Sequence, residues 1–114
     1  MKDWDEVVAF ALALPDTELS TSYGKPAVKV RGKAFVYPGR EAGSFAVATP
    51  LGEKEILMET DPDSFWETPH YRGWPAVLVR FESDDPGRVA RVIERAWWDR
   101  ASRAQRTARG GARP

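Results

Sequence analysis

The sequence predicts an α+β fold, a two-layer sandwich in which an antiparallel sheet of about five strands carries the N- and C-terminal helices on one face. Three observations predict it. Apolar residues recur at helical spacing near both ends of the chain, and they alternate with polar residues in the middle. The strand-like segments also follow one another closely, as in a hairpin-based sheet. The 114 residues include five Trp and five Phe, enough large side chains for one core.

The first helix is expected over about residues 3–14. Asp3 is a good N-cap, and Glu6 three residues later completes a capping-box pattern. Pro15 ends the helix because the residue before a proline is pushed away from helical geometry. The predicted buried face consists of Trp4, Val7, Val8, Ala11 and Leu12.

Residues 26–38 are predicted to form a β-hairpin, since Val28 and Val30 alternate with polar or small residues. Gly32-Lys33 fits a two-residue type II′ turn, with glycine in its first position. That turn would pair Val30 with Phe35 and Val28 with Tyr37. These four side chains would then share the core face of the sheet.

The remaining elements are expected in the order strand, helix, helical turn, strand and helix. They are Ser44–Thr49, Glu53–Glu59, a turn opened by Asp61-Pro62 that runs through Phe65 and Trp66, Ala76–Phe81, and a helix opened by Asp85-Pro86. In the middle helix, Ile56 and Leu57 should point inward. Residues 1–99 would thus form one domain. Residues 100–114 lack large apolar side chains, so we expect a basic, disordered tail.

The net charge of zero hides an uneven distribution. Residues 1–87 carry nine Lys and Arg against fifteen Asp and Glu, a net charge of −6. Residues 88–114 carry eight Arg against two acids, a net charge of +6. The arginines could form an arm for an acidic partner, or only the solvated face of a helix and its ragged end.

The residue types needed for most enzyme chemistry are missing, so we expect no enzyme and no cofactor. There is no cysteine, and the single histidine is His70. No phosphate-binding glycine loop is present. Glu59, Asp61 and Asp63 suit a helix N-terminus better than a metal site, so no metal is expected. The acidic start and the absence of a run of about 20 apolar residues predict a cytoplasmic protein without a membrane span.

Two surfaces are candidates for binding. The first is the outer face of the hairpin with its turn, where basic side chains could touch phosphates or merely protect an edge strand: Lys25, Lys29, Arg31 and Lys33. The second is the loop Pro69–Pro75, which combines Arg72 with three rings: His70, Tyr71 and Trp74. These rings could stack on a base or hold a small ligand, or could simply close the end of a small core.

Several motifs in one order resemble the MmcQ/YjbR family. They are Ala11–Pro15 after an acidic amphipathic helix, Ser22–Phe35 with its Tyr-Gly-Lys-Pro start, Asp61–Trp66 leading into Thr68–Val77, and a final helix that ends Ala96-Trp97. The resemblance covers about residues 3–100. It implies a two-layer fold similar to that of secretion chaperones, and no catalytic residues.

The resemblance also implies DNA as a partner, because the family is commonly described as DNA-binding through a double-wing surface. The wings would map to the turn at Gly32-Lys33 and to the loop that carries Arg72. Lys29, Arg31 and Lys33 would join Arg72 on the phosphates. The net acidic body departs from the basic face that such binding favours. A protein-interaction module, with an exposed aromatic surface of Trp66, Trp74 and Trp98, and a small-ligand-binding module therefore remain alternatives.

Overall fold

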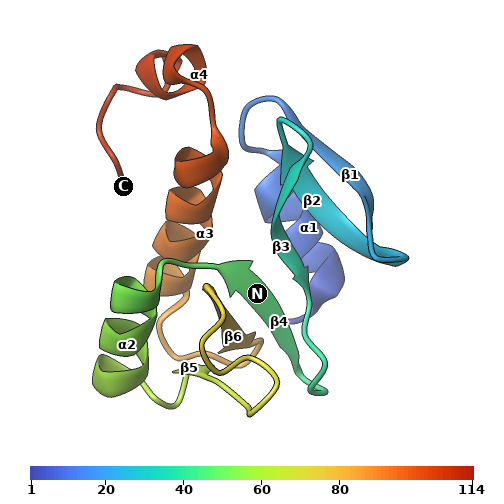
Figure 1. Ribbon diagram of the computed structural model, residues 1–114, viewed down its shortest axis with the longest axis vertical. Helices are drawn as coiled ribbons and strands as arrows, with labels where there is room; N and C mark the ends of the chain where they lie inside the picture. Colours follow the sequence, from blue (N-terminus) through green and yellow to red (C-terminus); the bar gives the residue numbers. More distant parts are fainter.

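The computed structural model describes residues 1–114 as six strands and four helices (Figure 1). In chain order these are α1 Trp4–Leu12, β1 Thr17–Ser22, β2 Lys25–Val30, β3 Lys33–Pro38, β4 Ser44–Ala48, α2 Leu51–Thr60, β5 Phe65–Trp66, β6 Ala76–Arg80, α3 Pro86–Arg100 and α4 Arg103–Ala108. None of the four helices combines the length and the apolar character that a membrane span requires.

All six strands belong to one antiparallel sheet with the order β1-β2-β3-β4-β6-β5. The predicted α+β class is confirmed, with six strands where about five were expected. The strand β1 has the sequence TELSTS, whose single large apolar residue creates no readable alternation. It forms nonetheless because β2 pairs with it along its whole length. The helical turn expected through Phe65 and Trp66 is wrong, since these two residues form β5 against β6.

The helices α1 and α3 pack on one face of the sheet and build the main core with it. The core joins Val7 and Ala11 of α1 to the buried face of α3, which extends from Val89 to Trp98. From the sheet, Phe45 and Val47 of β4 point into the same core. The longest helix, α3, runs beside β3 and β4 (Figure 1).

The helix boundaries follow local signals in the sequence. The side chain of Asp3 caps α1 by accepting from the backbone N–H of Glu6 at 2.9 Å. The side chain of Asp85 caps α3 in the same way, by accepting from the backbone N–H of Arg88, and Pro86 is the first helical residue. In α2 the prediction was half right, because Leu57 is buried whereas Ile56 is 57% exposed.

The register of the β2–β3 hairpin differs from the predicted one. Its turn residues are Arg31 and Gly32, with φ values of 54° and 73°, so both occupy the left-handed region that a type I′ turn requires. Val30 therefore pairs with Lys33, and a bulge changes the register so that Val28 pairs with Val36.

This shift exchanges the faces of two side chains in β3. Phe35 and Val36 both enter the main core, whereas Tyr37 packs against a second cluster on the opposite face. That second cluster consists of Ala46, Tyr71, Ala76 and Leu78, with Tyr37 and Trp66 beside it. The placement of Tyr37 on the core face was therefore wrong, because one extra residue in a strand redirects every side chain that follows it.

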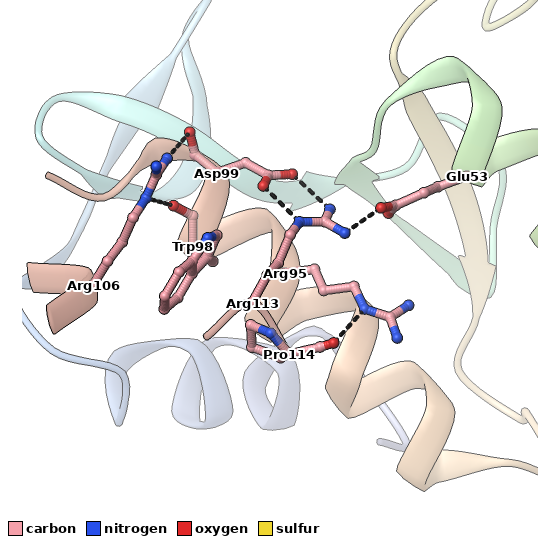
Figure 2. Close-up of polar contacts among 7 residues, drawn as sticks. All are labelled: Glu53, Arg95, Trp98, Asp99, Arg106, Arg113 and Pro114. Atoms are coloured by element: carbon pink, nitrogen blue, oxygen red, sulfur yellow. Dashed lines mark hydrogen bonds and ion pairs between the residues drawn. The ribbon is translucent and has the colours of Figure 1, made fainter. Parts of the chain in front are cut away.

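Residues 100–114 carry a short helix where the sequence predicted disorder. Ser102 and Gln105 form a complete capping box at the start of α4. Arg106 then donates to the carbonyl oxygens of Trp98 and Asp99, at the end of α3, at 2.8 and 3.2 Å (Figure 2). The arginines thus supply polar anchors in a segment that has little apolar surface to bury.

Candidate functional site

A concave pocket with a volume of about 540 Å³ lies on the sheet face opposite α1 and α3, and we call it the outer-face pocket. Its floor carries the small side chains of Ala34, Ala48 and Ala76. Alanine leaves space above a sheet where a larger residue would fill it. The volume falls within the range of about 300–1,000 Å³ that is typical of small-ligand sites.

Two chain segments form opposite rims of the outer-face pocket. One is the β1–β2 turn, with Tyr23 at its tip and Lys25 just beyond it. The other is the loop between β5 and β6, from which His70, Tyr71 and Trp74 line the pocket. Tyr23 is fully exposed and Trp74 is 64% exposed, whereas Tyr71 is buried. The rims therefore offer two aromatic rings with free surface.

The charges that line the outer-face pocket are all positive. Lys25, Arg40 and Arg100 are the three permanent cations, and His70 is the only other ionisable base. No Asp or Glu is among the fourteen lining residues. The acidic excess of the first 87 residues is therefore carried elsewhere on the molecule, and the pocket is a local basic site.

Burial perturbs two of the groups that line the pocket, Tyr37 and Arg100. Removal from water raises the pKa of the Tyr37 hydroxyl above its usual value, and the neighbouring Tyr71 adds to this rise while Arg100 opposes it. Removal from water likewise lowers the pKa of the Arg100 guanidinium, an effect that Asp99 and Tyr37 oppose. Arginine still carries its charge at neutral pH. Arg100 is thus a partly desolvated cation facing the pocket.

A buried lysine holds the β5–β6 loop in place. Lys54 of α2 is only 2% exposed. Its ammonium donates to the carbonyl oxygens of Tyr71 at 2.7 Å and Trp74 at 3.0 Å. It also forms an ion pair with Glu67 at 2.8 Å. These three contacts position one rim of the outer-face pocket from the far side of the loop.

Near the end of the chain, Arg113 forms an ion pair with Asp99 (Figure 2). Arg113 donates from Nε to Oδ1 and from Nη2 to Oδ2 of Asp99, both at 2.9 Å, and also contacts Glu53. The hydrogen bonds to Asp99 and Glu53, together with the charges of these carboxylates, raise the pKa of Arg113, and burial opposes this rise. Arg95 holds the end of the chain by donating to the Pro114 carbonyl oxygen at 2.8 Å. Asp99 is thus occupied on both oxygens, and Arg100 beside it has no ion-pair partner.

The structure brings together some of the residues that the sequence predicted as binding residues and separates others. Lys25, His70, Tyr71 and Trp74 all line the outer-face pocket. The other four predicted residues are not among the residues that line it: Lys29, Arg31, Lys33 and Arg72.

The predicted basic face of the hairpin is split. Lys29 pairs with Ala34 of the pocket floor, so it lies on the pocket side of the sheet. Lys33 pairs with Val30, whose side chain enters the main core, so it lies on the other face. The four hairpin cations therefore do not form one surface.

Among the charged and aromatic side chains of the pocket, four were absent from the predicted binding residues: Tyr23, Tyr37, Arg40 and Arg100. Tyr37 was assigned to the core by the register error, and Arg100 was counted with the arginines of the tail. The Tyr-Gly pair at positions 23 and 24 was a usable signal, since a glycine in the second turn position marks a hairpin turn. Nothing local identifies Arg40, which reaches the pocket from the loop after β3.

The three tryptophans suggested as an interaction surface do not gather on one face. Trp98 is buried in the main core, and the Arg106 guanidinium lies 5.6 Å from its ring centre. Trp66 packs on the second cluster, with Arg80 3.9 Å above its ring. Trp74 alone is widely exposed, at the outer-face pocket.

Comparisons with known proteins find one family and several relatives. The YjbR family model matches residues 12–98. The uncharacterized proteins Mb2600 of Mycobacterium bovis and Rv2570 of Mycobacterium tuberculosis are each 27% identical over 112 residues, which covers 85% of this chain and 87% of the relative. No solved structure matches.

Proposed function

Because the chain belongs to the YjbR family, we propose that it is a non-catalytic domain that binds nucleic acid, DNA in the first instance, at the outer-face pocket. The observation that carries this proposal is the content of the pocket. Three permanent cations line it together with the rings of three tyrosines, one tryptophan and one histidine, without a single carboxylate. Phosphates and bases are the ligand groups that match cations and rings in one site. A cytoplasmic location, where nucleic acid is accessible, belongs to the same proposal.

The uneven charge of the chain is compatible with this proposal. Local fields at a cleft depend on the charges that line it more than on the net charge of the molecule. Lys25 and Arg40 stand at the pocket, and Lys29 lies on the same side of the sheet. A nucleic-acid strand crossing this side would meet all three side chains.

Fluorescence anisotropy of labelled oligonucleotides tests the proposal. We expect binding that weakens steeply as salt is raised, because each phosphate contact releases condensed counterions. The double variant Lys25→Gln with Arg40→Gln should lose most of the affinity. Lys33→Gln removes the same kind of charge from the opposite face and serves as the matched control.

The outcome that contradicts the proposal is also simple. Absence of binding by the full chain at low salt would refute it, as would equal losses in the double variant and in Lys33→Gln. The oligonucleotide should be recovered intact after long incubation with the protein. A cleaved or modified product would contradict the non-catalytic part of the proposal alone.

A further inference from the structure

We infer that the outer-face pocket binds one unpaired nucleotide, with its phosphate at Arg100 and its base against the ring of Trp74. This inference rests on the proposed function and narrows it. The proposed ligand is narrowed from nucleic acid in general to nucleotides whose bases are not stacked in a duplex. The shared chemistry is a phosphate joined to a free base, supplied either by a single strand or by a free nucleotide.

The phosphate end of the site follows from the surroundings of Arg100. This side chain is half-buried at the edge of the pocket and makes no hydrogen bond or ion pair. Its sequence neighbour Asp99 would be the obvious partner, but both oxygens of Asp99 already accept from Arg113 (Figure 2). A partly desolvated cation that forms no ion pair within the chain is available to bind an external anion.

The base end follows from which rings have free faces. Tyr71 is fixed, since it is buried and its hydroxyl accepts from the backbone N–H of Arg40 at 3.4 Å. Trp74 is 64% exposed at the pocket rim, so one face of its indole is open to a partner. Base stacking on such a ring tolerates every base, because every base has a π face.

Tyr23 on the opposite rim adds an independent observation. It is fully exposed and has a φ of 53°, in the left-handed region that a bulky residue rarely adopts. Asn, Asp or Gly would fit this turn position without strain. A strained aromatic residue that packs on nothing suits a ligand contact better than a structural role.

The pocket fits an unpaired nucleotide better than a duplex. In a duplex both faces of each base are covered by neighbouring bases, so neither Trp74 nor Tyr23 could stack on one. A duplex-reading hairpin should also present its cations together, to reach phosphates on both sides of a groove. Here Lys29 and Lys33 lie on opposite faces of the sheet.

The experiment compares strand forms and variants in one assay. The probes are fluorescein-labelled ten-nucleotide oligothymidylate and a labelled duplex of the same length. Thymidine monophosphate and inorganic phosphate serve as unlabelled competitors. The variants are Arg100→Gln, Arg100→Lys and Trp74→Ala, with Lys33→Gln as the control outside the pocket. Far-UV circular dichroism and the urea midpoint establish that each variant is folded.

We expect the single strand to bind at least tenfold more tightly than the duplex. Arg100→Gln and Trp74→Ala should each weaken single-strand binding on the order of tenfold, whereas Lys33→Gln should change it less than about twofold. Arg100→Lys should recover part of the loss, because it restores the charge. If thymidine monophosphate displaces the labelled strand at a much lower concentration than inorganic phosphate does, a free nucleotide is sufficient for binding at the pocket. Failure of the nucleotide to compete would identify the strand as the ligand.

Other results overturn the inference. Duplex binding as tight as single-strand binding would overturn it and leave the proposed function intact. Binding of the single strand by a folded Arg100→Gln protein with the affinity of the original chain would also overturn the inference and leave the proposed function intact. If neither strand form binds, the proposed function itself fails.

Discussion

The buried lysine of α2 offers the sharpest test of how the β5–β6 loop is held. Lys54 is 2% exposed, and its ammonium contacts two loop carbonyl oxygens and the carboxylate of Glu67. Lys54→Met keeps the length and the apolar stem of the side chain but removes all three polar contacts. The perturbation therefore separates the polar contribution from the packing contribution.

The expected magnitude follows from what each partner loses. The carbonyl oxygens of Tyr71 and Trp74 each lose a charged donor, although each still accepts from a backbone N–H, that of Trp74 at 3.0 Å and that of Ala76 at 2.8 Å. A hydrogen bond to a charged group contributes about 1.5–3 kcal/mol, so the two lost bonds together cost about 3 kcal/mol at the low end of that range. Glu67 is 27% exposed and can be hydrated instead, so it adds less. We therefore expect the free energy of unfolding to fall by about 3 kcal/mol, the low end of the range for removing one partner of a buried ion pair.

Urea unfolding followed by tryptophan fluorescence measures this loss. With a denaturant slope of about 1.5 kcal/mol/M, a loss of 3 kcal/mol lowers the midpoint by about 2 M. The matched control is Lys33→Met, since Lys33 is exposed and makes no ion pair. It should change the free energy of unfolding by less than about 0.5 kcal/mol. A midpoint for Lys54→Met within about 0.3 M of the original chain would refute the reasoning, as would an equal effect of the control.

Two further predictions concern other groups around the pocket. A Cβ on Gly39 would stand 2.4 Å from Ser44 Oγ and 3.0 Å from a Leu78 methyl carbon, so Gly39→Ala should cost about 1–3 kcal/mol in chemical unfolding. A Cβ on Gly52 in α2 meets nothing within 4 Å, so Gly52→Ala should be neutral or stabilising by up to about 1 kcal/mol. Equal effects of both would contradict this. The raised pKa of Tyr37 means that its stabilising contribution is complete below about pH 10 and is lost as the pH rises through the folded pKa. Tyr37→Phe should therefore lose less stability than the original chain between about pH 8 and about pH 11, and parallel urea midpoints for both would exclude the assignment.

The sequence predicted best those features that depend on neighbours along the chain. The caps at Asp3 and Asp85 formed as expected because a capping side chain bonds to backbone groups only three residues away. The helical spacing of apolar residues near the end of the chain agrees with the buried face of α3. The prediction that β2 and β3 form a hairpin is confirmed, whereas the predicted pairs of residues across that hairpin are wrong. Turn type depends on the φ angles of its two central residues, and the residue types Arg31 and Gly32 do not by themselves determine these angles.

The candidate site was only half visible in the sequence. His70, Tyr71 and Trp74 stand together in one loop, and Lys25 belongs to a readable strand, so composition indicated them. Tyr37, Arg40 and Arg100 come from three separate segments and meet only where the sheet, its following loop and the end of α3 converge.

The sequence by itself therefore determined the fold class, the family and the two long helices, since periodicity, caps and ordered motifs are local properties. Only the tertiary structure decided that β1 is a strand, that Tyr37 faces away from the core, and that Arg100 is left without a carboxylate partner. Each of these depends on a partner outside the segment concerned: the edge of β2, the bulged pairing of β3 with β2, and the contact of Arg113 with Asp99. Cross-strand pairing and ion pairs between segments are set by where the backbone places the two segments, and the apolar pattern of one segment alone does not determine that placement.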